Sequence, residues 1–172
     1  LSPQLSTTYF DWVNFYTEEM IKYAKANLRI DTNRIIVTGL SLGGGGAWRY
    51  ATSSLSNAQQ LAAVAPVCGT CSGVTYNNIA TANLPLWAFH ALDDGVVGAG
   101  CTTSQVAAVE LASPAIAPLM TLYSSGGHGI WDRAYDYNYN WQNPNIYEWF
   151  LGQNTSLPVN ILPVSNAGPN IT

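Results

Sequence analysis

Apolar residues gather along the chain in four short runs, each bounded by polar or turn-forming residues. These runs occupy residues 34–38, 61–67, 84–90 and 120–123. Continuous apolar runs of this length, in which β-branched and aromatic residues recur, predict buried strands. The strands are expected to centre on Ile36, Val64, Trp87 and Leu122.

Longer segments around these runs predict helices. They lie near residues 9–28, 45–54, 103–112 and 145–151. The first has apolar residues spaced by three and four, which is typical of an amphipathic helix, and Thr7 or Thr8 is a candidate cap for its start. Strands that alternate with helices indicate an α/β protein with a mostly parallel sheet.

One short motif joins the first predicted strand to the second predicted helix. Its sequence is Gly39-Leu40-Ser41-Leu42-Gly43. A serine on such a turn is held in a strained conformation with its hydroxyl exposed, and small neighbours let the backbone approach closely. The motif therefore indicates the nucleophile elbow of a serine hydrolase, although a glycine-rich turn that only begins a helix also fits. The glycines up to Gly46 each disfavour a helix by up to about 1 kcal/mol, which suggests close packing there.

The two histidines of the chain are the candidate bases. His128 lies on a glycine-rich loop after the fourth predicted strand, and His90 ends the third. Asp93 and Asp94 follow His90 closely. Loops after parallel strands emerge at one edge of the sheet, so we expect Ser41, an aspartate and His128 to meet there. His90 is interpreted as a structural histidine that bonds loop backbone.

These residues have complementary roles in acyl transfer. Ser41 attacks an acyl carbon, while His128 takes the serine proton and later delivers it to the leaving group. The aspartate orients the imidazole and stabilises its charged form. The backbone N–H of Leu42 supplies one donor to the oxyanion.

Three ordered segments resemble one known family. Residues 39–44, 90–97 and 127–135 are similar to the signature segments of secreted α/β-hydrolase carboxylesterases. The nearest groups are polyhydroxybutyrate-depolymerase-like and dienelactone-hydrolase-like esterases, which border the prolyl-oligopeptidase-type peptidases. In that family the acid is the fourth residue after the histidine of an H-G-x-x-D segment, which here is Asp94. Asp93 is the alternative, and Ala91 stands where the family usually has glycine.

The resemblance implies a three-layer α/β/α hydrolase fold and hydrolysis of acyl esters without a metal or an organic cofactor. In the family, further strands and a His-Gly-type loop precede the nucleophile, and that loop supplies a second oxyanion N–H. The residues before Ser41 contain neither feature. We therefore expect this chain to lack the first strands of the fold, with other segments of the same protein before and after it.

Composition narrows the class of protein. Hydrophobic residues make up 48% of the chain and charged residues 9%, a balance common in secreted domains. Six Lys and Arg against ten Asp and Glu, without a basic cluster, exclude an obvious nucleic-acid site. No apolar run approaches the roughly 20 residues that span a bilayer.

The three cysteines favour one structural disulfide. Cys101 follows the proposed acid loop, and Cys68 and Cys71 follow the second predicted strand. A bridge from Cys101 to Cys71 or to Cys68 would brace the acid loop and indicates an oxidising compartment, either secreted or at the cell surface. The Cys-x-x-Cys spacing also fits a redox pair or half of a metal site, but without a second such pair a metal is not expected.

Aromatic residues follow His128. They are Trp131, Tyr135, Tyr137, Tyr139 and Trp141. They fit either a wall that binds sugar or aryl groups, with Trp131 nearest the cleft, or a surface loop packed on the last helix. The substrate is thus expected to be a small-molecule or polysaccharide-linked ester.

The end of the chain changes character. The hydrolase domain is expected over residues 1–152, where Gly152 ends the last helix. Residues 153–172 are predicted to be a linker, since residues 154–172 carry three prolines and no charge. Residues 165–172 resemble the opening of a polycystic-kidney-disease-type immunoglobulin-like repeat. Two other functions stay open: a serine peptidase with the same triad, and a non-catalytic hydrolase-like module of a large surface protein.

Overall fold

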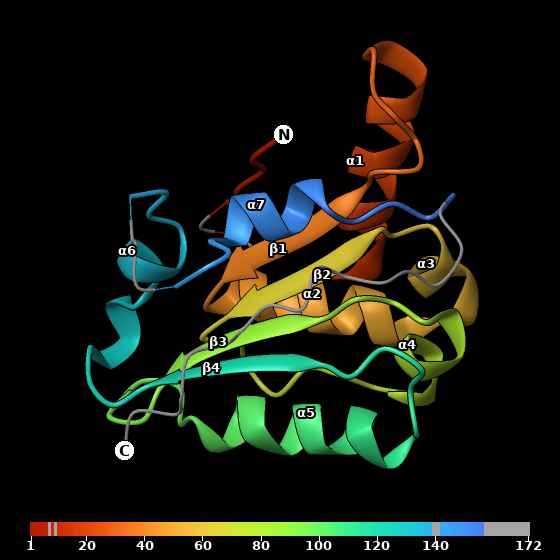
Figure 1. The fold of residues 1–172 in the computed structure, drawn as a ribbon. Helices are drawn as coiled ribbons and strands as arrows, with labels where there is room; N and C mark the ends of the chain where they lie inside the picture. The colour runs from red at the N-terminus through yellow and green to blue at the C-terminus, as the bar shows by residue number, and fades with distance from the viewer. Residues whose placement is uncertain (7, 9, 139–141, 157–172) are drawn as a thin grey trace.

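The computed structural model describes residues 1–6, 8, 10–138 and 142–156. Its centre is a parallel sheet of four strands in sequence order (Figure 1). The strands are β1 (Ile36–Leu40), β2 (Ala63–Val67), β3 (Trp87–Ala91) and β4 (Leu119–Tyr123). Each strand contains one of the four predicted centres. All five residues of both β2 and β3 are buried, because these strands lie inside the sheet.

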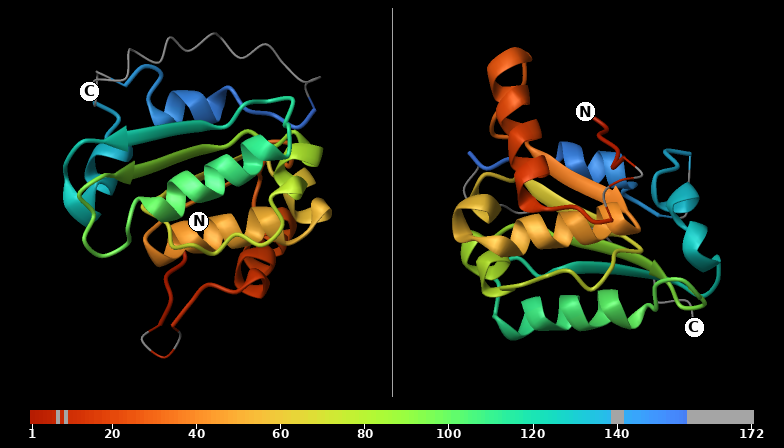
Figure 2. Two further views of the ribbon diagram at one scale, coloured as in Figure 1. Left: turned by 90° about the horizontal axis from the view of Figure 1, so that it is seen from below. Right: turned by 180° about the vertical axis from the view of Figure 1, so that it is seen from behind.

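Helices cover both faces of this sheet. The longer ones are α1 (Asn14–Asn27), α2 (Leu42–Ser53) and α5 (Gly100–Leu111). The shorter ones are α3 (Leu55–Gln59), α4 (Asn77–Ala82), α6 (Trp131–Ala134) and α7 (Ile146–Leu151), with a 3-10 turn over Gly127–Gly129. Figure 2 shows α2 and α5 against one face and α7 against the other. The layers are therefore α/β/α, as the family resemblance implies.

Alternate residues of the strands contribute side chains to two separate hydrophobic cores, one on each face of the sheet. On the α2 and α5 face, Val64 and Ala88 pack with Trp48 and Val106. On the α7 face, Phe89 packs with residues that include Val67, Trp87, Ile146 and Trp149. Because successive strand side chains point to opposite faces, one continuous apolar run supplies both cores.

Three helices begin elsewhere than predicted; one of them is α5, which the sequence predicts from residue 103 and which begins at Gly100. The first helix begins at Asn14 rather than near residue 9, and its N-cap is Val13, without a side-chain cap. The expected cap is wrong for Thr8, which lies in a turn, because Asp11 and Trp12 bind Arg49 instead of continuing the helix. The second helix begins at Leu42, so the glycines lie within it.

Some predictions fall outside the described residues. They concern Thr7 as a cap, Tyr9 as a helix start, Tyr139 and Trp141 in the aromatic stretch, and the linker and repeat over 157–172. Within the described residues, no helix is long and apolar enough to span a membrane.

Candidate active site

The four strands deliver four chemically active side chains to one edge of the sheet. Ser41 directly follows β1, Cys68 directly follows β2, and Asp94 lies three residues after β3. His128 lies five residues after β4, on the 3-10 turn. Because all four strands are parallel, their carboxyl ends coincide, which is where α/β proteins place their ligand sites.

Ser41 occupies a sharp turn between β1 and α2. Its backbone has φ 53° and ψ −120°, a region that costs a non-glycine residue on the order of 1–3 kcal/mol. The turn closes tightly, since a Cβ on Gly39 would lie 2.5 Å from the carbonyl carbon of Gly43. Glycine at position 39 is thus required by its direct contact with the backbone of Gly43.

Ser41, His128 and Asp94 form a continuous hydrogen-bonded relay. Ser41 Oγ lies 2.8 Å from His128 Nε2, and His128 Nδ1 lies 2.8 Å from Asp94 Oδ2. A carboxylate only accepts, so Nδ1 carries the proton and Nε2 is left to accept from the serine hydroxyl. The structure brings together these three residues, which the sequence places 53 and 34 positions apart (94 minus 41, and 128 minus 94).

Asp94 is buried and fully engaged. Its Oδ1 accepts the backbone N–H groups of Val96 and Val97, each at 2.9 Å. Burial raises the pKa of the Asp94 carboxyl, but the hydrogen bond from His128 and those two N–H groups outweigh it and leave the pKa below its ordinary value. Asp94 therefore stays ionised at neutral pH, as an acid that stabilises an imidazolium must.

The neighbouring Asp93 has a different role from the alternative acid that the sequence allows. Its carboxylate accepts from the backbone N–H of Gly127 at 2.8 Å and of Gly126 at 3.2 Å. These hydrogen bonds, that of Gly127 first, lower the pKa of Asp93. Asp93 therefore ties the loop that carries His128 to the loop that carries Asp94.

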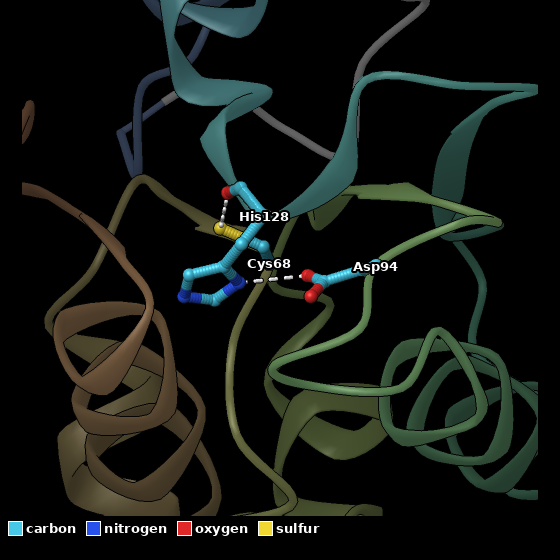
Figure 3. A group of neighbouring side chains, drawn as sticks. All are labelled: Cys68, Asp94 and His128. Carbon is cyan, nitrogen blue, oxygen red and sulfur yellow. Dashed lines mark hydrogen bonds and ion pairs between the residues drawn. The ribbon is translucent and has the colours of Figure 1, made fainter.

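A thiol lies behind the histidine. Cys68 is buried, and its Sγ donates to the backbone oxygen of His128 at 3.4 Å (Figure 3). Ligand atoms of Cys68, Asp94 and His128 lie within 4.8 Å of one another, a spacing that a metal ion could bridge. However, burial raises the pKa of the thiol to about 11, and the other two atoms already bind each other. This donor set suits proton transfer better than metal binding.

The first turn of α2 supplies backbone donors beside Ser41. The N–H of Ser41 itself is bonded to Val67 O at 3.0 Å, whereas the N–H of Leu42 has no acceptor in the part of the chain that the structure describes. The free N–H groups of a helix start carry partial positive charge. Leu42 is thus positioned as the predicted oxyanion donor.

The glycines of α2 let this helix pack closely against its neighbours. A Cβ on Gly44 would lie 2.7 Å from Val67 O, and one on Gly45 would overlap the hydroxyl of Thr70. A Cβ on Gly46 would lie 2.6 Å from Cβ of Trp12. The cost in helix propensity therefore has a packing reason at each of these three positions.

An open cleft of about 1180 Å³ runs along β1 and reaches Ser41. Trp12, Leu42 and Tyr135 are among the residues that line it. Trp131, the expected substrate contact, is not among them; its ring meets the ring of His128 edge-on, with centroids 5.4 Å apart. Trp131 therefore packs against the base without lining this cleft.

Three solved structures share the arrangement of strands and helices found in this chain. A thermostable esterase matches 81% of this chain and 36% of its own, with 27% identity and a TM-score of 0.61. A putative dienelactone hydrolase from Klebsiella pneumoniae matches 68% of this chain and 49% of its own, at 19% identity and a TM-score of 0.54. An acylaminoacyl peptidase from Pyrococcus horikoshii matches 83% of this chain and 28% of its own, at 14% identity and a TM-score of 0.61.

The chain has the α/β-hydrolase fold. Its structural neighbours are esterase-like and peptidase-like members of that fold, as the sequence motifs predict. The chain spans less than half of each of these three proteins, so its sheet corresponds to part of theirs. No protein-family model matches the sequence, and no curated protein matches it.

A disulfide lies close to the edge of the sheet that carries the candidate active site. It joins Cys71 to Cys101, with the Cα atoms 4.8 Å apart, and Cys68 is the free cysteine. Cys101 lies in the first turn of α5, directly before Thr102, whose Oγ1 lies 2.7 Å from Nδ1 of His90. The bridge therefore holds the start of α5, whose Thr102 contacts His90 next to Asp94.

Two contributions to the site have only a weak sequence signal. The Asp-Asp doublet suggests two competing acids, whereas the structure gives Asp93 and Asp94 separate partners. Trp12 lies on a segment with helical apolar spacing, yet it leaves the helix and enters the cleft. Only the packing of its side chain against Gly46, which needs coordinates, reveals its position.

Proposed function

We propose that this chain carries the reactive centre of a serine carboxylesterase that hydrolyses an acyl ester. The observation that carries the proposal is the unbroken relay from Ser41 Oγ through His128 to Asp94, with both hydrogen bonds at 2.8 Å. The strained elbow supports it too, because strain at a reactive serine has a cost that a simple helix start does not need.

The reaction follows from these contacts. Ser41 Oγ attacks the carbonyl carbon as its proton passes to His128 Nε2, and the carbonyl electrons move to an oxyanion that accepts from the Leu42 N–H. Collapse breaks the bond to the alcohol, which leaves with the proton from His128. Water then attacks the acyl-enzyme by the same route, and the acid is released.

Turnover of short p-nitrophenyl esters by the full-length protein tests this proposal. Ser41→Ala should abolish turnover and labelling by a fluorophosphonate probe, whereas exposed Ser104→Ala on α5 should leave both unchanged. Equal rates in the Ser41→Ala variant and the wild type would end the proposal. Persistent silence of a folded wild-type sample towards the probe favours the non-catalytic module instead.

A serine peptidase would use the same three residues, so substrates must separate the two activities. A panel that pairs each acyl group as an ester and as an amide measures the ratio of the two kcat/KM values. We place the protein in an oxidising compartment, secreted or at the cell surface, on the support of the Cys71–Cys101 disulfide. Esters carried on a polysaccharide belong in the panel, because half-buried Trp131 and exposed Tyr137 follow the base.

A further inference from the structure

Trp12 lies at the entrance of the nucleophile helix although it belongs to the segment before α1. It lines the same cleft as Ser41, Leu42 and Gly43. The segment approaches the helix because Asp11 and Trp12 leave the helical path that the sequence predicts, and α1 begins only at Asn14. An aromatic side chain is thereby brought beside the reacting serine.

The Trp12 indole packs closely against α2 because glycine residues there leave room for it. A Cβ on Gly46 would lie 2.6 Å from Trp12 Cβ and 2.8 Å from its Cγ, so only glycine admits the ring there. At the other end of the ring, Nε1 lies 3.8 Å from the position of a Cβ on Gly43. The indole therefore lies along the first turn of α2, with its N–H at the end nearest Ser41.

Arg49 fixes this position from the same helix. Its Nη1 donates to the backbone oxygen of Trp12 at 2.6 Å, and its Nη2 lies 2.5 Å from Asp11 Oδ2. The other oxygen of Asp11 accepts the backbone N–H of Trp12 at 2.8 Å. A donor held by several contacts to the helix that carries the nucleophile is preorganised, which is the property that catalytic dipoles need.

The indole N–H itself is not used within the protein. Trp12 is half-buried, and its Nε1 has no acceptor among the residues that the structure describes. An indole N–H is only a donor, and one this close to a buried surface ordinarily finds a partner. Trp12 and Leu42 line the same cleft, so a substrate oxygen held there can reach both N–H groups.

We infer that the Trp12 indole N–H donates a hydrogen bond to the oxygen of the reacting carbonyl, as a second donor beside the Leu42 N–H. This inference rests on the proposed function, because it requires an acyl substrate on Ser41. It assigns to a side chain of this segment the role that the family resemblance gives to a backbone N–H. As negative charge develops on the oxygen, both donors strengthen their bonds to it.

Trp12→Phe removes the donor and keeps an aromatic ring on Gly46. In the full-length protein, with active sites counted by fluorophosphonate, kcat should fall on the order of 100-fold while KM changes little. Phe15→Leu is the matched control, because Phe15 is exposed at the start of α1 and outside the cleft; its kcat and KM should equal those of the wild type. A wild-type kcat in Trp12→Phe, or a change confined to KM, would overturn the inference and leave the proposed function standing.

A second measurement does not depend on the variant's folding. In ¹⁵N-labelled wild type, formation of a phosphonate adduct on Ser41 should move the Trp12 indole proton downfield, because an anionic oxygen then occupies the oxyanion position. The indole proton of Trp48, which is buried without a partner in the described core, serves as the reference and should stay in place. An unmoved Trp12 resonance in the adduct contradicts the inference. A wild type that neither labels nor turns over esters overturns both the function and this role.

Discussion

His90 and His128 both approach the same carboxylate oxygen, yet they are equipped for different tasks. Asp94 Oδ2 lies 2.8 Å from His128 Nδ1 and 3.2 Å from His90 Nε2. The His128 side chain is 16% exposed and the His90 side chain is completely buried. The two residues are of the same type and lie at similar distances from the acid. What distinguishes the candidate base, His128, from the structural histidine, His90, is that its side chain is partly exposed.

The hydrogen-bond partners assign opposite tautomers to the two rings. His90 Nε2 lies 2.8 Å from the carbonyl of Val97, so this nitrogen carries the proton and Nδ1 accepts from Thr102 Oγ1. His128 carries its proton on Nδ1 and offers Nε2 to Ser41. His90 thus has both nitrogens occupied by the protein, whereas His128 has one directed at the nucleophile.

Of the predicted substitutions, replacement of His128 should have the largest effect on kcat. His128→Ala removes the base, and we expect kcat for an ester substrate to fall by about 10⁴- to 10⁶-fold. The free energy of unfolding should fall as well, because buried Asp94 loses the hydrogen bond that most offsets its burial. Stopped assays with titrated enzyme measure the first quantity and urea denaturation the second. Retention of wild-type turnover would remove His128 from the mechanism.

Asp94→Asn should have the next largest effect. An asparagine at this position cannot stabilise the imidazolium and favours the wrong tautomer, so kcat should fall on the order of 10⁴-fold. The low pKa of Asp94 gives a second readout. A depressed carboxyl pKa contributes stability that is present above the ordinary carboxyl range and is lost as pH falls through the folded pKa. The variant should therefore lose less stability than the wild type when the pH is lowered from neutral through the carboxyl range.

Replacing His90 tests the supporting role. His90→Gln leaves Thr102 or Val97 without a matched partner in a buried site, so unfolding should become easier by roughly 2–4 kcal/mol. Turnover per labelled Ser41 should fall by no more than about tenfold, as expected for a change of position and not of chemistry. A loss equal to that of His128→Ala in a folded sample would show that His90 takes part in proton transfer.

Replacement of Cys68, which lies behind His128, should have the smallest effect, and it concerns stability at alkaline pH. Its raised pKa, about 11 in the folded state, means that the folded protein holds the thiol proton where the unfolded chain has released it. Stability from this group is therefore present below the ordinary thiol range and falls by roughly 2 kcal/mol as pH rises from 9 to 11. Cys68→Ala should show a shallower alkaline decline in urea melts. Identical slopes would mean that the thiol titrates normally.

The strands and the order of the site residues follow from local pattern, and the three layers from the family resemblance. The apolar runs around Val64 and Trp87 form the two buried inner strands, whereas those around Ile36 and Leu122 form the outer, only partly buried strands of the described sheet. Parallel order then brings the loops after all four together. The elbow is also local, because strand, small residue, serine and small residue are consecutive. Sequence alone therefore predicts the fold and the meeting of Ser41 with His128.

Contacts between segments far apart in the chain are what the sequence does not reveal. The start of α1 depends on Arg49, which draws Asp11 and Trp12 away from a helix that their own spacing favours. The choice between Cys68 and Cys71 as the partner of Cys101 depends on a few ångströms at the end of β2. Trp131 is expected from the sequence to line the cleft, but it begins the short helix α6 and its ring packs on His128.

The glycine run at the start of α2 limits which of its positions can accept other residues. Methyl groups at positions 44, 45 and 46 meet a carbonyl, a hydroxyl and an indole, while one at position 43 finds only ordinary contact distance. A saturation library over the four codons should therefore yield survivors almost exclusively at the first. Position 43 is therefore the place in this turn where the side chain can vary without disturbing the packing of α2.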